Sequence, residues 1–260
     1  QPPAAAFLLR RSAFGIRFVG AAARLRRSTA GWPSSVGASA SVGASDFGSS
    51  GLAAPLPVAD IDPRCTFAPR VRAMTPTGMF LTPGAGSGRD HPTLVALEEA
   101  LAPLPVARVD FPYRREGRKA PDRAPKLVAF TREEAAVVAA DLGVDAAGLV
   151  FGGRSMGGRI CSMAVAEGMP AAGLVLISYP LHPPGKPERL RIEHLPQLDL
   201  PCLFLSGTKD PFGTPDEFAE HLAAIPGPVT TVWLEGGRHD LKGQDPAIVA
   251  AVQAWLPTLG

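Results

Sequence analysis

The chain has 260 residues, of which 46% are hydrophobic and 19% are charged, and its formal net charge is +2. This length and apolar content allow one large α/β domain with a sizeable core or two small ones, and we favour one. Residues 1–59 carry six Arg and a single acid, Asp46, and so leave 20 basic against 23 acidic residues in the remainder. The remainder is slightly acidic, which gives no reason to expect a nucleic-acid-binding protein.

The first 59 residues are dominated by Ala, Ser, Gly, Pro and Arg and show no sustained period of either 2 or 3.6. We therefore predict a disordered or extraneous arm over residues 1–59 and one domain over residues 60–260, whose body begins between Ala59 and Gly78. An extraneous origin, as translated upstream sequence of a GC-rich genome, agrees with the excess of Arg over Lys and with a first methionine at Met74.

Targeting signals are the second interpretation of this arm. Phe7–Leu25 is Arg-rich, free of acids and loosely amphipathic, as in an organelle transit peptide. The twin Arg10-Arg11 resembles part of an export signal, but Arg17 interrupts the apolar run that such a signal needs. No apolar run approaches the ~18 residues that span a bilayer. We expect a cytoplasmic protein without membrane association.

Beyond Thr77, strand-like and helix-like segments alternate, which is typical of an α/β fold with a mostly parallel sheet and helices on both faces. The expected strands are the apolar runs Met79–Thr82, Ala107–Phe111, Gly148–Phe151, Gly173–Ser178, Cys202–Ser206 and Thr230–Leu234. The expected helices are Pro92–Leu101, Leu127–Leu142, Gly158–Glu167, Pro215–Ala224 and Pro246–Leu256. Proline in the first turn or glycine after the last turn supports several of these ends.

Two further segments are less regular. Tyr179–Pro201 is rich in proline and charge and follows a strand at the edge where such sheets bind ligands, so we expect a short lid there. Cys65–Val71 is the only candidate for an earlier strand, and its prolines weaken it. The sheet is therefore expected to be shortened at that edge.

The cysteines and the known binding motifs give no sign of a metal or a cofactor. Cys65, Cys161 and Cys202 lack metal-ligand spacing, and two of them lie in segments expected to form a core helix and a core strand. Free thiols in a reducing compartment are the expected state. The chain has neither a Walker-type loop nor an H-E-x-x-H motif, so we expect no metal and no cofactor.

The most informative motif is G-x-S-x-G, formed by Gly153-Arg154-Ser155-Met156-Gly157 between an apolar run and a helix-like segment. A sharp strand-to-helix turn has no room for side chains beside the serine, and it lifts the serine hydroxyl into solvent. An ordinary Gly-rich turn with a bystander serine is the alternative. The strand and helix on either side favour a nucleophile at Ser155.

A serine nucleophile needs a base and a group that orients the base. Asp210 follows the apolar run Cys202–Ser206, and His239 follows Thr230–Leu234. Both residues would lie on loops at the carboxyl ends of parallel strands, and the chain order Ser155, Asp210, His239 is that of α/β-hydrolases. Alone, Asp210 would be interpreted as a turn or cap residue and His239 as a surface-loop histidine. Together with Ser155 they predict a catalytic triad.

The tetrahedral intermediate of acyl transfer also needs hydrogen-bond donors for its oxyanion. The backbone amide of Met156 is one candidate, because it begins the nucleophile helix. The second is expected in the loop Pro83–Gly88, with Ala85 as the first choice and the candidate substrate-binding residues Gly84 and Gly86 beside it.

The same loop allows a dinucleotide-binding interpretation, because the glycines of Gly84–Gly88 follow a strand and precede a helix. Asp110 ends the next strand and could be the acidic residue that binds the ribose of a dinucleotide. The third glycine comes one residue early, however, and Pro83 intrudes at the turn. The hydrolase interpretation is therefore favoured.

Arg154, Arg191 and His194 raise the question of a carboxylate-bearing substrate. Arg154 adjoins the expected nucleophile, and the other two lie in the expected lid. A solvated arginine, or one paired with an acid such as Asp110, is the alternative that we favour. Arg154 and His194 are kept as candidate substrate-binding residues.

Several segments together resemble one family. They are Thr82–Pro92 (TPGAGSGRDHP), Asp110–Arg114 (DFPYR), Gly152–Arg159 (GGRSMGGR), Ser178–Pro187 (SYPLHPPGKP) and Leu234–Asp240 (LEGGRHD). They are similar to bacterial α/β-hydrolases related to dienelactone hydrolase, in the group that shares a domain with testis-expressed and NSL-complex-subunit-3 proteins. The resemblance covers about Met79 to Leu256 and implies a compact α/β-hydrolase fold without a large cap domain.

The resemblance also implies that Ser155, Asp210 and His239 are the triad. Dienelactone hydrolase itself uses a cysteine nucleophile, so its lactone substrate is not carried over to Ser155. We expect hydrolysis of a small-molecule acyl ester or thioester through an acyl-enzyme. Some eukaryotic members serve as assembly subunits, so a non-catalytic binding or scaffold protein is the alternative. Acyl chain length and oligomeric state are not predicted.

Overall fold

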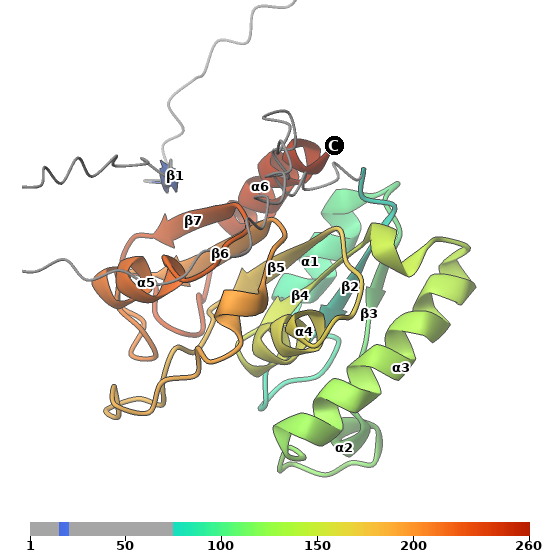
Figure 1. Ribbon diagram of the computed structural model, residues 1–260, viewed down its shortest axis with the longest axis horizontal. Helices are drawn as coiled ribbons and strands as arrows, with labels where there is room; N and C mark the ends of the chain where they lie inside the picture. The colour runs from blue at the N-terminus through green and yellow to red at the C-terminus, as the bar shows by residue number, and fades with distance from the viewer. Residues whose placement is uncertain (1–15, 21–74) are drawn as a thin grey trace, which may run out of the picture. The chain divides into compact units, whose positions relative to one another are not determined.

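The computed structural model describes residues 16–20 and 75–260 (Figure 1). The other residues of the predicted arm, the candidate strand Cys65–Val71 and the thiol of Cys65 lie outside the described residues. The expected boundary between an arm over 1–59 and a domain over 60–260 therefore stays a prediction.

A seven-stranded sheet forms the centre of the domain. Its strands are β1 (Ile16–Gly20), β2 (Gly78–Thr82), β3 (Val106–Arg108), β4 (Leu149–Arg154), β5 (Gly173–Ile177), β6 (Cys202–Gly207) and β7 (Val229–Leu234). They are arranged in the order β1-β7-β6-β5-β4-β2-β3. Strands β2 to β7 are mutually parallel, and β1 pairs antiparallel with β7. The mostly parallel α/β sheet is confirmed, and β1 is a strand inside a segment for which the sequence predicts none.

The described part of the chain has six α-helices, of which the first five lie between strands and α6 follows the last strand. They are α1 (Pro92–Leu101), α2 (Pro112–Arg115), α3 (Ala124–Leu142), α4 (Met156–Ala166), α5 (Pro215–Leu222) and α6 (Asp245–Trp255). Short 3-10 turns lie at η1 (Ala146–Gly148), η2 (Leu195–Gln197) and η3 (Leu256–Leu259). All five predicted helices are present, with ends displaced by a few residues at most.

The sequence prediction was wrong at the end of β3 and missed α2. The expected strand Ala107–Phe111 ends at Arg108, and Phe111 instead becomes the N-cap of α2. Pro112 explains the change, because its fixed φ suits the first turn of a helix and it lacks the amide that a strand would need. The chain therefore leaves the sheet early and forms a short helical turn beside it.

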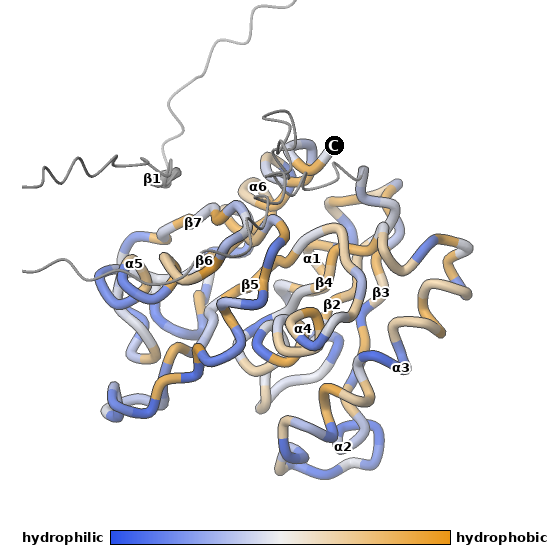
Figure 2. Tube along the Cα trace, viewed as in Figure 1, coloured by the Kyte–Doolittle hydropathy of each residue, from blue (hydrophilic) through white to orange (hydrophobic). Residues whose placement is uncertain are grey.

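The alternation of side chains along each strand divides the core into two layers. In β5, for example, Leu174 and Leu176 pack with α3 and α4, whereas Val175 and Ile177 pack with α1 and α6. Strands buried on both faces need near-continuous apolar runs, and β2, β4, β5 and β6 have them. Figure 2 shows the hydrophobic residues along these strands and hydrophilic residues in the loops around α2 and after β5.

The long connection between β5 and β6 contains only the turn η2, and the described residues include no separate cap domain. The irregular character predicted for Tyr179–Pro201 is confirmed, and its role as a lid stays a prediction. No helix in the described part of the chain is both long enough and apolar enough to span a bilayer.

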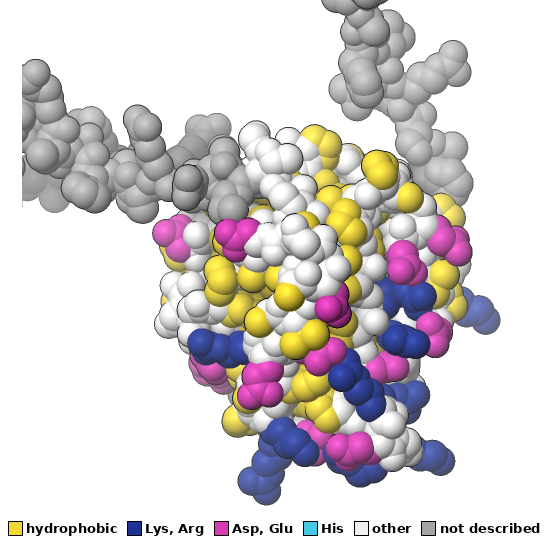
Figure 3. Space-filling view, turned by 90° about the vertical axis from the view of Figure 1, so that its right-hand side faces the viewer, with side chains coloured by type: hydrophobic (Ala, Val, Ile, Leu, Met, Phe, Trp, Pro, Cys, Tyr) yellow, Lys and Arg dark blue, Asp and Glu magenta, His cyan; other side chains and the backbone are white. Residues whose placement is uncertain are grey.

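The face formed by β3, α2 and α3 carries interspersed basic and acidic side chains (Figure 3). Ion pairs account for many of them, including Arg108 with Glu98, Arg115 with Glu134 and Arg118 with Asp122. Exposed pairs of this kind contribute little stability, roughly 0 to 1 kcal/mol each. This face therefore shows no extended patch of a single charge.

Candidate active site

Ser155 lies at the turn between β4 and α4, and its backbone is strained. Its φ of 48° and ψ of −114° are rarely adopted by a residue with a side chain. A Cβ added at Gly153 would lie 2.1 Å from the Thr82 carbonyl oxygen, and one at Gly157 would lie 2.5 Å from the same oxygen. Both flanking glycines are therefore required by sterics, as the motif predicts.

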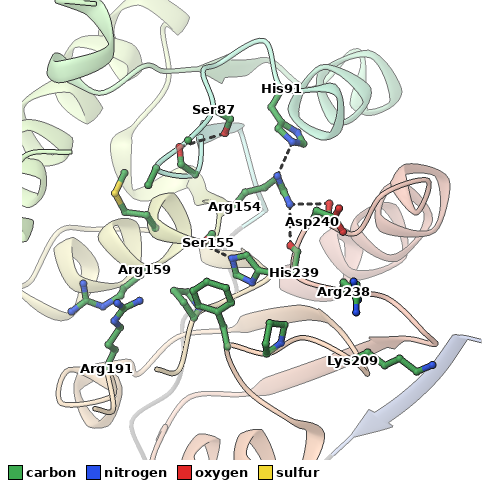
Figure 4. A pocket seen from close by; sticks show the side chains of 17 residues that line it. Ser87, His91, Arg154, Ser155, Arg159, Arg191, Lys209, Arg238, His239 and Asp240 are labelled. Atoms are coloured by element: carbon green, nitrogen blue, oxygen red, sulfur yellow. Dashed lines mark hydrogen bonds between the residues drawn. The ribbon is translucent and has the colours of Figure 1, made fainter. Parts of the chain in front are cut away.

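The structure brings the three predicted triad residues together, and Figure 4 shows the contact between Ser155 and His239. Ser155 Oγ lies 2.8 Å from His239 Nε2, and His239 Nδ1 lies 2.9 and 3.0 Å from the two carboxylate oxygens of Asp210. With Nδ1–H donating a hydrogen bond to the Asp210 carboxylate, Nε2 is free to accept a hydrogen bond from the serine hydroxyl. The arrangement can deprotonate Ser155 when the hydroxyl attacks a carbonyl.

Asp210 and His239 are held by the loop that follows β6. Asp210 is only 4% exposed, and one of its oxygens accepts a 2.9 Å hydrogen bond from the Phe212 amide. The Phe212 ring stacks on the His239 imidazole at a centroid distance of 3.8 Å. Sequence reasoning missed Phe212, although its position two residues after Asp210 was an available signal. These contacts restrict both the carboxylate and the imidazole plane.

Arg154 is buried beneath the site and links three segments. Its Nη2 donates to the carbonyl oxygens of His239 (3.1 Å) and Asp240 (2.9 Å), and its Nη1 lies 2.6 Å from His91 Nε2. His91 Nδ1 also lies 3.2 Å from the Thr93 amide, so both ring nitrogens face hydrogen-bond donors. Burial and the charge of Arg154 lower the pKa of His91, which agrees with a neutral ring.

This geometry differs from both expectations for Arg154. The side chain lines the pocket, yet its terminal nitrogens are directed at backbone carbonyls and at His91 rather than into the cavity. It is not paired with Asp110, whose carboxylate instead accepts a 2.7 Å hydrogen bond from the Arg89 amide. Arg154 therefore positions the loop that carries His239.

The loop after β2 lies opposite the nucleophile. Gly84, Ala85 and Gly86 line the same pocket as Ser155 and Met156. The Tyr113 hydroxyl donates a 2.9 Å hydrogen bond to the Ala85 carbonyl and so restrains the loop. Sequence reasoning missed Tyr113 because no local pattern shows that α2 packs beneath this loop.

The dinucleotide interpretation loses its main support. Asp110, the acid that this interpretation requires for a ribose, is engaged by the Arg89 amide. Gly84 and Gly86 line the pocket that contains Ser155, and the loop they belong to begins no helix until Pro92. The loop therefore belongs to the serine site.

The pocket has a volume of about 980 Å³ and is formed by loops that follow β2, β4, β5, β6 and β7. The structure does not bring His194 into it. His194 Nε2 instead lies 2.8 Å from Ser162 Oγ on α4, and burial, with the charge of Arg159 as a smaller cause, lowers the pKa of His194 to about 4. His194 is therefore a neutral, partly buried residue that packs against α4 outside the pocket.

The cysteines are free and buried where the structure describes them. Cys161 lies in α4 and Cys202 begins β6, so the predicted core helix and core strand are confirmed. Burial raises the pKa of the Cys161 thiol to about 12 and that of Cys202 further still. Neither thiol is a nucleophile at neutral pH.

A serine on a strained turn after one parallel strand, an acid after a later strand and a histidine after the next define the α/β-hydrolase class. Comparison with known families gives the same result. The model described as "Alpha/beta hydrolase domain" matches residues 76–250, and the chain belongs to this family of hydrolases. The narrower group that includes testis-expressed and NSL-complex-subunit-3 proteins stays a prediction.

Solved structures of hydrolases share the fold at low sequence identity. Est1E from Butyrivibrio proteoclasticus is 17% identical, with a TM-score of 0.55, over 72% of this chain and 89% of that one. Dienelactone hydrolase from Anabaena variabilis is 18% identical, with a TM-score of 0.55, over 70% and 87%. A putative α/β-superfamily hydrolase from Xanthomonas campestris is 21% identical, with a TM-score of 0.52, over 71% and 99%.

Proposed function

We propose that the protein hydrolyses a small-molecule acyl ester or thioester through an acyl-enzyme on Ser155. The observation that carries this proposal is the 2.8 Å contact between Ser155 Oγ and His239 Nε2, with Asp210 on the other ring nitrogen. Nucleophile, base and orienting acid are then within hydrogen-bond reach of each other, which is the geometry that activates a serine.

In the first half-reaction, Ser155 Oγ attacks the substrate carbonyl carbon while His239 Nε2 takes the hydroxyl proton. The carbonyl oxygen becomes an oxyanion, which the backbone amides of Met156 and Ala85 stabilise. His239 then gives its proton to the leaving alcohol or thiol, and the acyl group stays on Ser155. Loss of one oxyanion donor typically costs roughly 10²- to 10³-fold in turnover.

In the second half-reaction, water attacks the acyl-serine ester. His239 accepts a proton from that water, a second oxyanion forms, and its collapse returns the proton to Ser155 Oγ and releases the carboxylic acid. Asp210 holds the same imidazole tautomer throughout and stabilises the imidazolium that forms in each half. The reaction consumes one ester and one water and needs no further reactant.

The test compares wild-type protein with Ser155→Ala on a panel of 4-nitrophenyl esters and in labelling by a fluorophosphonate. Ser155→Ala should lose both hydrolysis and labelling. Ser87→Ala is the matched control, because Ser87 is the other serine among the described residues that line the pocket, and it should keep both. Equal labelling of wild type and Ser155→Ala would refute the assignment, and a folded wild type without either signal would favour a scaffold.

A further inference from the structure

Two arginines form one wall of the pocket, on the side away from His239 (Figure 4). Arg159 lies one turn into α4, and its amide donates to the Ser155 carbonyl at 3.1 Å. Arg191 comes from the connection after β5. Their side chains lie next to each other at the pocket, although the two residues are 32 positions apart in sequence. Arg159 is four residues from Ser155, so it shares the helix face that meets the nucleophile.

Neither guanidinium has a protein partner among the described residues. Arg108, Arg115, Arg118 and Arg132 all form ion pairs, whereas Arg159 and Arg191 form none. No hydrogen bond from either guanidinium to the described residues is present, and Nε of Arg159 is fully buried without an acceptor. The terminal nitrogens of both guanidinium groups make no hydrogen bond within the described part of the chain, so the pair is suited to a ligand that supplies acceptors.

The two arginines also repel each other. After burial, the charge of Arg159 is the largest cause that lowers the pKa of Arg191. Both side chains are partly buried, so this repulsion is screened less than it would be between two exposed groups. An anion between them would remove the repulsion and satisfy the free donors at once.

A buried hydrogen-bond network fixes the backbones of both arginines. Ser162 Oγ donates to the Arg159 carbonyl at 2.8 Å and contacts His194 Nε2, and the Tyr179 hydroxyl donates to the Arg191 carbonyl at 2.7 Å. His194, which the sequence nominates for substrate binding, is thus a support for this wall. Groups held in place before binding bind a ligand at a smaller entropic cost.

The other cations at the pocket are different. Lys209 and Arg238 are exposed and lie near His239, and their charges contribute a general positive field rather than a defined contact. Arg154 uses its terminal nitrogens on protein acceptors. Arg159 and Arg191 are the pocket-lining cations that combine partial burial with a guanidinium group making no hydrogen bond to the described residues.

We propose that Arg159 and Arg191 bind a carboxylate carried by the substrate, so that the preferred substrates are half-esters or half-thioesters of dicarboxylic acids. This inference rests on the proposed ester hydrolysis and names its substrate class. A planar guanidinium matches the two oxygens of a carboxylate, and such charge-assisted pairs are the strong ones. The free carboxylate would occupy the arginine wall while the ester carbonyl lies at Ser155.

The first experiment measures kcat/KM for monomethyl and dimethyl esters of succinate, glutarate and adipate. Wild type should prefer the half-esters, with one chain length best. Arg159→Gln and Arg191→Gln should each lower kcat/KM for the half-esters by roughly 10- to 100-fold, mainly through KM, because hydrogen bonds to charged groups are worth about 1.5–3 kcal/mol. The dimethyl esters should change less than about threefold.

Arg189→Gln is the matched control. Arg189 lies in the same segment and carries the same charge, but it is exposed and does not line this pocket. It should leave both substrate series unchanged. If a glutamine variant does not fold, Arg159→Lys and Arg191→Lys retain the charge without the planar fork and should still weaken the half-esters selectively. Equal loss for half-esters and dimethyl esters would overturn the inference.

The second experiment measures binding without turnover. Calorimetric titration of the Ser155→Ala variant with monomethyl succinate should show binding. The double variant with Ser155→Ala and Arg159→Gln should not bind it, and dimethyl succinate should bind weakly to both variants. Equal affinity for the two esters, or tighter binding of inorganic phosphate, would overturn the carboxylate subsite.

The two proposals fail in distinguishable ways. Turnover of dimethyl esters that depends on Ser155, without any preference for half-esters, would overturn the subsite and leave ester hydrolysis intact. Arginine-dependent binding of monomethyl succinate by a protein that hydrolyses no ester would support the subsite and refute the proposed hydrolysis.

Discussion

The guanidinium of Arg154 donates a 3.1 Å hydrogen bond to the backbone carbonyl of His239, and the same nitrogen reaches the Asp240 carbonyl at 2.9 Å. Arg154 directly precedes Ser155 in sequence, whereas His239 follows it by 84 positions. The contact therefore ties the turn that carries the nucleophile to the loop that carries the base. The distance between Ser155 and His239 depends on this tie.

Replacing Arg154 should lower turnover on every substrate alike. Arg154→Gln removes the donor to His239, so the imidazole loses its fixed distance from Ser155, and we expect kcat to fall roughly 10- to 100-fold because small misplacements of reacting groups are costly. Steady-state kinetics on neutral and acidic esters measure this loss of kcat. A loss confined to acidic esters would instead make Arg154 a substrate contact.

Asp210→Asn should preserve the fold and remove most of the activity. The asparagine amide can turn a donor toward His239 Nδ1 and so favour the tautomer that protonates Nε2, which can no longer accept the serine proton. We expect kcat to fall about 10³- to 10⁴-fold, the size of the loss known for this change in serine proteases. The measurement is kcat together with the rate of fluorophosphonate labelling. A loss below tenfold would mean that another group orients His239.

Tyr113→Phe should impair the oxyanion loop. It removes the hydroxyl that donates to the Ala85 carbonyl while leaving the buried ring in place. We expect a loss of about 0.5–1.5 kcal/mol of stability and a fall in kcat of about tenfold, since the Ala85 amide would be less well aimed. Chemical denaturation and ester kinetics test this. An unchanged kcat with the expected loss of stability would show that the loop needs no anchor there.

Gly153→Ala should destabilise the domain severely. The added methyl would lie 2.1 Å from the Thr82 carbonyl oxygen, and that backbone belongs to β2, which pairs with a strand on each side and cannot move without disturbing them. We expect a loss of about 3 kcal/mol or more in the free energy of unfolding. Gly86→Ala is the control for stability, because an added Cβ there meets nothing within 4 Å. Similar unfolding midpoints for the two variants would contradict the steric account of the motif.

His194 should make the folded protein sensitive to acid. Its pKa falls from 6.5 in the unfolded chain to about 4 in the folded one, so between these values the unfolded chain binds a proton that the folded protein does not. Stability is therefore lost as the pH falls from about 6.5 to about 4. The thermal midpoint measured against pH should fall less steeply for His194→Gln than for wild type. If the thermal midpoints of wild type and His194→Gln fall equally with pH, another group causes the acid sensitivity.

Much of the fold could be predicted because four of its strands, β2, β4, β5 and β6, are buried along their whole length. The run Cys202–Ser206 matches β6 within one residue, since only continuous apolar segments suit a covered parallel sheet. Thr230–Leu234 also matches β7 within one residue, although that strand is only partly buried. The end of β3 could not be predicted in this way, because Val109 and Phe111 are as apolar as a strand requires. Their burial against α2 and α3 depends on where Pro112 turns the chain.

The sequence by itself determined the order of Ser155, Asp210 and His239 on loops that follow parallel strands. Such strands end at one edge of the sheet, so the order alone brings the three side chains close together. Only the tertiary structure decided what each arginine near the nucleophile does. Arg154 and Arg159 look alike in sequence, but the direction of a side chain depends on what fills the space around it. The guanidinium of Arg154 meets carbonyl oxygens of a distant loop. That of Arg159 meets no protein acceptor among the described residues.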